Sequence, residues 1–178
     1  MLTFLASVYV SLMTHNSIGR RTFVKAVGAG ALVASSSVAS AARPPAKRFK
    51  AHLTGDEEVP PVDTNAQGQA NFKLSKDGSE LSYKVNVANI EDVIGVHIHN
   101  ESAGVNGDIV VFLFGEPFVD NEDAVTVNGT FLEGTIADGD VRGLSELSAL
   151  LDEMRAGNTY VNVHTIGVRS GEIRGQIS

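Results

Sequence analysis

The sequence contains no cysteine and no tryptophan, and only 6% of its 178 residues are aromatic. The absence of cysteine excludes disulfide frameworks, thiol nucleophiles, thiolate zinc sites and iron–sulfur clusters. Any metal site must therefore use histidine, carboxylate or amide ligands. Basic residues are also scarce: 14 Lys and Arg stand against 21 Asp and Glu, and the net charge of −7 argues against sequence-independent binding to nucleic acid.

Hydrophobic residues make up 43% of the chain, which is enough for one folded domain. The 18 glycines and the scarcity of helix-forming stretches favour a mostly β fold. The sequence has no phosphate-binding loop, no dinucleotide fingerprint, no Gly-x-Ser-x-Gly elbow and no His-Glu-x-x-His zinc helix. Nucleotide-dependent and serine-hydrolase chemistry therefore have no basis in the sequence.

The N-terminal segment has the organisation of an export signal. Gly19–Lys25 (GRRTFVK) resembles a twin-arginine signal, with Arg20, Arg21 and Phe23 as its signature residues. The apolar run that follows, Ala26–Val38, is shorter than the about 20 residues that span a bilayer, so we interpret it as the hydrophobic region of the signal. The alternative interpretation is a buried alanine-rich helix.

Small residues mark the end of this signal. Ala39 and Ala41 occupy the two positions that signal peptidase recognises, which predicts cleavage after Ala41. Because a further apolar stretch precedes the signal, we expect translation to start at either Met1 or Met13. The predicted organisation is a signal over residues 1–41, a short linker over 42–48 and one domain over 49–178.

The exported part of the chain is expected to be acidic. Residues 42–178 carry 11 Lys and Arg against 21 Asp and Glu, a net charge of −10, which favours solubility without indicating a fold. We expect export by the twin-arginine route to the medium or the cell surface, with no membrane anchor after signal removal. We expect no nucleic-acid partner; the extracellular ligand and the oligomeric state are not specified by the sequence.

Alternation of apolar and polar residues predicts strands through the exported chain. In Leu81–Asn89, apolar residues recur at every second position, which is typical of a half-buried strand. The same criterion gives nine candidate strands: Phe49–Leu53, Ala70–Leu74, Leu81–Asn89, Val93–His99, Ile109–Phe114, Ala124–Val127, Thr130–Ile136, Thr159–Thr165 and Glu172–Ile177.

Three dipeptides predict hairpin turns, and one segment predicts a helix. Asn128-Gly129 is typical of a type I′ turn, and Asp77-Gly78 and Ser170-Gly171 indicate two more. In Leu144–Arg155, apolar residues recur at helical spacing before Gly157, which predicts one amphipathic helix closing an end of the fold. The expected fold is mainly β: a Greek-key β-sandwich or barrel of about eight or nine strands with one inserted short helix.

The histidines form the most informative group of polar residues. His97 and His99 lie two residues apart on a predicted strand, so both project from one face, about 6.6 Å apart along the strand. The same alternation places His164 on the polar face of a later strand together with Asn162. If these strands are neighbours, the three imidazoles converge and form a site for one Cu or Zn ion. The alternative is a polar network that stabilises the fold.

Other polar residues carry weaker signals. His52, near the first predicted strand, either joins the histidines or has a structural role. We interpret Glu57, Glu58 and the pair Glu91–Asp92 as solvated charges rather than catalytic carboxylates. The acidic loop Glu116–Asp123 lacks the oxygen spacing of a calcium loop, so we expect it to be solvated.

Several segments resemble, in order, the CHRD domain, the module first described in chordin. They are Glu58–Val62 (EVPPV), His97–His99 (HIH), Tyr160–Thr165 (YVNVHT) and Gly171–Ile177 (GEIRGQI), within a resemblance that covers Phe49 to Ile177. The resemblance implies an exported, immunoglobulin-like β domain and no particular biochemical activity.

A more distant resemblance concerns the histidines. The His-x-His strand and the Val163-His164 strand are similar to those that supply three copper ligands in Cu,Zn superoxide dismutases, which are Greek-key β proteins. The chain departs from that family because it has no histidine between His99 and His164 to bridge a second metal, no zinc loop and no paired cysteines.

Three hypotheses for the function follow. The first is an exported CHRD-domain module without catalytic residues, acting in binding or structure, with His97, His99 and His164 as its metal site. The second is a small copper-dependent oxidoreductase that uses the same histidines. The third is a cell-surface adhesion module that acts through strand edges or loops.

Overall fold

A computed structural model describes residues 45–178. The described part contains the following elements: β1 (Arg48–Thr54), β2 (Gln67–Leu74), β3 (Leu81–Asn100), β4 (Asp108–Phe114), β5 (Val125–Ile136), α1 (Leu147–Ala156), β6 (Thr159–Thr165) and β7 (Ile173–Gln176). The predicted signal, with its residues Arg20, Arg21, Phe23, Ala39 and Ala41, lies outside the described residues.

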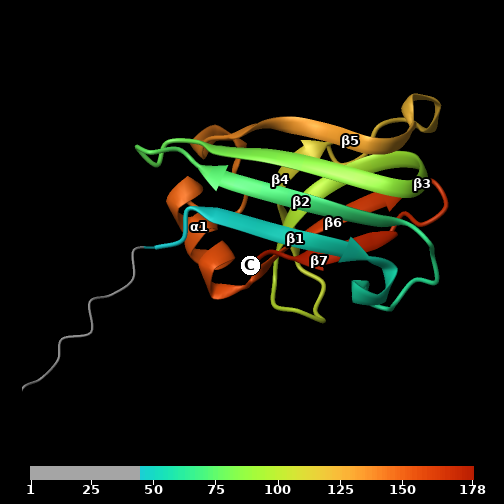
Figure 1. The fold of residues 1–178 in the computed structure, drawn as a ribbon, viewed down its shortest axis with the longest axis horizontal. Helices are drawn as coiled ribbons and strands as arrows, with labels where there is room; N and C mark the ends of the chain where they lie inside the picture. Colours follow the sequence, from blue (N-terminus) through green and yellow to red (C-terminus); the bar gives the residue numbers. More distant parts are fainter. Residues whose placement is uncertain (1–44) are drawn as a thin grey trace, which may run out of the picture. The chain divides into compact units, whose positions relative to one another are not determined.

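The strands form a closed antiparallel sheet (Figure 1). Strands β2, β1, β7, β6 and β3 are hydrogen-bonded in that order, and pairing between β2 and β3 closes them into a five-stranded barrel. Strands β4 and β5 pair with β3 outside this ring. The prediction of a mainly β fold is confirmed, and of the two expected architectures the structure has the barrel.

Strand β3 is twice as long as expected because it joins two predicted strands. Leu81–Asn89 and Val93–His99 are continuous, and the chain bends between them, where Asn89 (φ 56°) and Asp92 (φ 52°) have left-handed backbone. Asn and Asp tolerate this conformation better than other non-glycine residues. The first half of β3 therefore pairs with β2 and β5, and the second half pairs with β4 and β6.

The predicted hairpin at Asn128-Gly129 is wrong. Both residues lie inside β5, where Gly129 (φ 121°) pairs with Val87 next to irregularities in the register. The long β3 offers pairing partners along the whole segment, so the chain continues as one strand instead of turning back. Together with the continuity of β3, this gives seven strands rather than nine within residues 45–178. The other two predicted turns are confirmed, since they connect β2 to β3 and β6 to β7.

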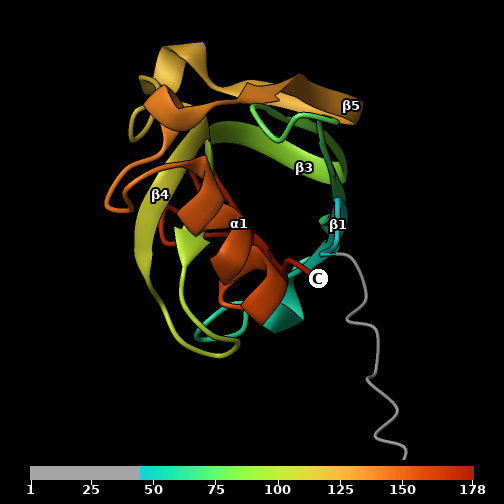
Figure 2. The same ribbon diagram turned by 90° about the vertical axis from the view of Figure 1, so that its left-hand side faces the viewer.

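Helix α1 lies across one end of the barrel (Figure 2). Its side chains Leu147, Leu150, Leu151 and Met154 are buried and belong to the same hydrophobic core as the inward-facing residues of the strands. The helix ends at Gly157, which has left-handed backbone as expected for a helix C-terminus. Within residues 45–178, no helix has the length and hydrophobicity needed to cross a membrane.

Candidate metal centre

Pairing of β3 with β6 brings together the predicted site residues. Asn162 lies opposite His97, and His164 lies opposite Gly95, two residues before His97. Because side chains alternate along each strand, the histidines point to the side of the sheet that faces away from the core residues Val96 and Ile98.

The three histidines form a buried cluster, called the histidine cluster below. The centroids of their rings are 4.9 Å apart for His97 and His164, 5.8 Å for His99 and His164, and 5.9 Å for His97 and His99. One nitrogen from each ring lies within 4.8 Å of those of the other two. The exposed fractions of these residues are only 0%, 7% and 5% for His97, His99 and His164.

Backbone carbonyls hold one nitrogen of each ring. His97 Nε2 lies 3.3 Å from Gly115 O, His99 Nδ1 lies 2.9 Å from Gly107 O, and His164 Nδ1 lies 3.0 Å from Arg169 O. A carbonyl oxygen accepts hydrogen bonds, so these nitrogens carry the ring proton.

The other nitrogen of each ring is then a free acceptor. His97 Nδ1, His99 Nε2 and His164 Nε2 are buried and have no hydrogen-bond partner. Buried polar atoms are nearly always hydrogen-bonded in proteins, so three unpartnered lone pairs in one cluster require an explanation.

Burial keeps the histidine cluster neutral. The pKa of His97 is lowered to about 4, mainly by burial and also by the neighbouring His99. The pKa of His164 is lowered to about 3, again mainly by burial and also by His97 and His99. Burial also lowers the pKa of His99, and the positive charge of Arg174 acts in the same direction. At neutral pH all three rings can therefore donate a lone pair to a metal ion.

The arrangement is compatible with one metal ion after a small contraction. Metal–nitrogen bonds of about 2.0–2.1 Å place the nitrogens of a tetrahedral or trigonal site about 3.3–3.6 Å apart. The distances between the ring nitrogens would have to shorten by up to roughly 1.2–1.5 Å from the 4.8 Å limit. Imidazole ligands suit Cu and Zn.

Aromatic rings enclose the cluster. The ring of Phe112 meets that of His97 edge-on at 5.2 Å, Phe118 lies 5.2 Å from His164, and Tyr160 stacks on His99 at 4.8 Å. Gly95 permits this closure, because a Cβ atom there would lie 2.8 Å from the Phe118 ring and 2.9 Å from His97 Cε1.

A buried arginine lies next to the cluster. Arg174 is 1% exposed, and its guanidinium lies over the Tyr160 ring, 3.4 Å from the centroid. It donates hydrogen bonds to the loop that follows β3, with Asn106 Oδ1, Ser102 O and Val105 O as acceptors. Arg174 thereby holds the same loop whose Gly107 carbonyl orients His99. Alternation with the buried Ile173 places Arg174 on the other face of the sheet, opposite Asn162 on β6.

Glu58 is also buried, so the prediction that it is solvated is wrong. Its exposed fraction is 5%, and Asn162 Nδ2 donates a 3.5 Å hydrogen bond to Glu58 Oε2. Burial raises the pKa of Glu58 to about 7, although the nearby positive charge of Arg174 opposes the shift.

The remaining candidates lie outside the histidine cluster. His52 is exposed on β1 and pairs with Gln69 of β2. Glu57, Glu91 and Asp92 are exposed, as predicted. In the loop Glu116–Asp123 the acidic side chains are exposed, as predicted, while Phe118 packs on the histidines.

Comparison with known proteins gives one match. A family model described as the CHRD domain matches residues 49–177. No curated protein and no solved structure matches the chain.

Proposed function

The chain belongs to the CHRD domain family, and from this membership and the histidine cluster we propose that it is an exported module that binds one copper or zinc ion. The observation that carries the proposal is the set of three buried, unpartnered ring nitrogens on rings whose other nitrogen is held by a backbone carbonyl. Metal-binding histidines are oriented in this way, through a hydrogen bond from the second ring nitrogen.

Each part of the site has a role in holding an ion. The carbonyls of Gly115, Gly107 and Arg169 fix the tautomers, and burial keeps the rings unprotonated. When bound, the ion would accept the lone pairs of the three buried nitrogens that have no hydrogen-bond partner. The twin-arginine signal supports an exported location, and that route would allow a folded, metal-loaded protein to leave the cell.

Burial of the cluster favours a binding or structural role over catalysis. A catalytic metal needs a coordination position that substrate can reach. The histidines are at most 7% exposed, and Phe112, Phe118 and Tyr160 pack against their rings. The copper-dependent oxidoreductase is therefore the second candidate.

Elemental analysis of the purified protein tests the proposal. After incubation with Cu(II) or Zn(II) and removal of excess metal, we expect about one ion per chain. The triple variant His97→Ala/His99→Ala/His164→Ala should lose it. The variant His52→Ala removes an exposed histidine outside the cluster and should retain it. Circular dichroism of each variant establishes that it is folded.

A second measurement covers the case in which the triple variant does not fold. The electron paramagnetic resonance spectrum of the Cu(II)-loaded wild type should show coupling to three imidazole nitrogens, and to two in His164→Gln. Absence of stoichiometric metal in the folded wild type would refute the proposal. Rapid dismutation of superoxide that disappears in His99→Ala would support the oxidoreductase instead.

A further inference from the structure

A groove with a volume of about 580 Å³ crosses the outer face of β1, β2 and the first half of β3. These strands lie side by side in Figure 1. The side chains of Phe49 and Phe72 point into the core, so their backbone forms the floor of the groove. Outward side chains on both sides of this floor form the walls.

Four cationic side chains occupy the walls. On one side Arg48 of β1 lies directly opposite Lys73 of β2. On the other side Lys50 of β1 and Lys84 of β3 flank Asn71 of β2. All four are exposed. We call this feature, lined by Arg48, Lys50, Lys73 and Lys84, the cationic groove.

The spacing brings these charges close together. Strands are about 4.8 Å apart, and residues two positions apart along a strand are separated by about 6.6 Å. Like charges directly opposite each other, such as Arg48 and Lys73, destabilise a strand pair. An anionic ligand in the groove would offset this repulsion.

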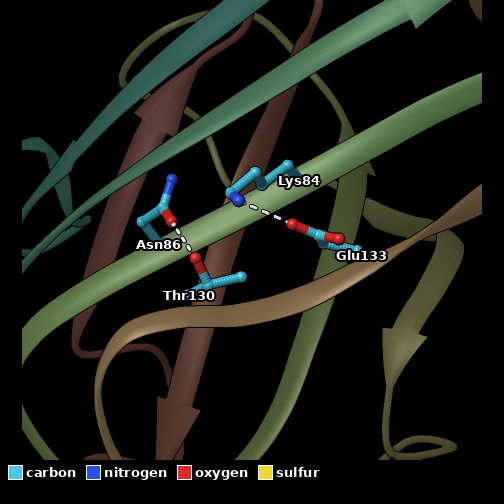
Figure 3. Close-up of polar contacts among 4 residues, drawn as sticks. All are labelled: Lys84, Asn86, Thr130 and Glu133. Carbon is cyan, nitrogen blue, oxygen red and sulfur yellow. Dashed lines mark hydrogen bonds and ion pairs between the residues drawn. The ribbon is translucent and has the colours of Figure 1, made fainter.

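Acidic residues neutralise little of this charge. Of the ion pairs within residues 45–178, only that of Lys84 Nζ with Glu133 Oε1 of β5, at 2.6 Å, involves the cationic groove (Figure 3). Figure 3 also shows the neighbouring hydrogen bond from Thr130 to Asn86 on the same outer face. The side chains of Arg48, Lys50 and Lys73 form no ion pair in the described chain. Ser178 also lines the groove, and its O accepts a 2.9 Å hydrogen bond from the backbone N of Lys50.

Most basic residues of the described chain are concentrated around the groove, although the protein as a whole is acidic. Residues 45–178 hold 10 Lys and Arg, and six of them lie just before β1, on β1, on β2, in the turn after β2 or at the start of β3: Lys47, Arg48, Lys50, Lys73, Lys76 and Lys84. The Debye length at 0.1 M salt is about 10 Å, so a ligand in the groove senses these cations more than the distant acids.

We propose that the cationic groove binds an acidic polysaccharide through the carboxylate or sulfate groups of its sugars. The amide of Asn71 and the hydroxyl of Ser82 line the groove and can exchange hydrogen bonds with sugar hydroxyls. Single-stranded nucleic acid binds through exposed aromatic rings on which bases stack. Phe49 and Phe72 are 5% and 2% exposed, and Tyr83, which also lines the groove, is half-buried against the core. None of these three rings is fully exposed for stacking, so a sugar polymer is the better match.

The proposed ligand relies on the exported location proposed above but not on the metal. Binding of dextran sulfate and polygalacturonate to the purified protein, measured by isothermal titration calorimetry at 50 and 300 mM salt, tests it. We expect binding that weakens with salt, and no binding of uncharged dextran. Lys50→Gln/Lys73→Gln should weaken binding about tenfold, as expected for two lost charge contacts.

Two further variants separate the groove from general charge effects. Arg142→Gln/Arg155→Gln removes the same charge from residues outside the groove and should leave binding unchanged. Glu133→Gln frees Lys84 and should strengthen binding, a gain that misfolding cannot produce. Absence of binding to both acidic polymers, equal losses in the two double variants, or tighter binding of oligothymidylate would overturn the proposal. Since none of these variants changes a histidine, the result is independent of the metal analysis.

Discussion

At the scale of single residues, burial acts in opposite directions on two kinds of ionisable group. It lowers the pKa values of the three histidines and so keeps them uncharged. It raises the pKa of Glu58 to about 7, so that this carboxyl is half-protonated near neutrality. Both effects have the same cause, because a charged group loses its hydration when it enters the protein.

The raised pKa of Glu58 predicts a specific dependence of stability on pH. An unfolded Glu releases its proton near pH 4.5, whereas the folded protein retains it up to about pH 7. The stabilisation is therefore complete below pH 4.5 and is lost as the pH rises through 7. Relative to Glu58→Gln, which stays neutral, the wild type should lose about 2–3 kcal/mol between pH 5 and pH 8.

Urea denaturation of both proteins at these two pH values measures the effect. Comparison with the variant cancels the contributions of all other groups, including the histidines. An equal difference in stability between the two proteins at both pH values would show that Glu58 titrates normally.

At the scale of elements, the bend in β3 determines both the barrel and the histidine cluster. Because of the bend, the first half of β3 pairs with β2 and β5, and the second half pairs with β4 and β6. The second half of the strand pairs with β6 and thereby places His97 and His99 next to His164. Residues with left-handed backbone at the bend are therefore needed for the site as well as for the fold.

Substitution of Asn89 tests this conclusion. A β-branched residue is strained at φ 56°, so Asn89→Val should lower the free energy of unfolding by about 1–2 kcal/mol relative to Asn89→Gly. Both variants remove the hydrogen bond from Asn89 Nδ2 to Asn65 O, so their difference isolates the backbone effect. The midpoints of urea denaturation give this difference; equal midpoints would mean that the bend tolerates any residue.

At the scale of the whole molecule, the site joins segments from distant parts of the chain. The rings come from β3 and β6, and the carbonyls that orient them come from the loops at residues 107, 115 and 169. Unfolding separates all of these groups, so a metal ion that binds the cluster stabilises the folded state only.

Metal-dependent stability is therefore the expected global consequence of the site. Zn(II) at 100 times its dissociation constant should raise the free energy of unfolding by about 2.7 kcal/mol, and EDTA should remove the gain. His52→Ala should respond like the wild type, and the triple histidine variant should not respond. Chemical denaturation with and without metal provides the measurement, and an equal gain in the triple variant would indicate metal bound elsewhere.

The sequence by itself determined the mainly β class, the end of the helix at Gly157 and the face of the strand on which His97, His99 and His164 lie. These features depend on local periodicity, which adjacent residues specify. The motif segments likewise sufficed for the CHRD resemblance, in agreement with the family match over residues 49–177.

Only the tertiary structure decided which strands continue and which polar residues are buried. Asn128-Gly129 has the local chemistry of a turn, yet pairing with the long β3 keeps it within a strand. Glu58 has the local character of a solvated charge, yet the fold packs it near Arg174 and Asn162. In both cases partners far away in the sequence outweigh local preference, because pairing and burial depend on contacts that form only when the whole barrel closes.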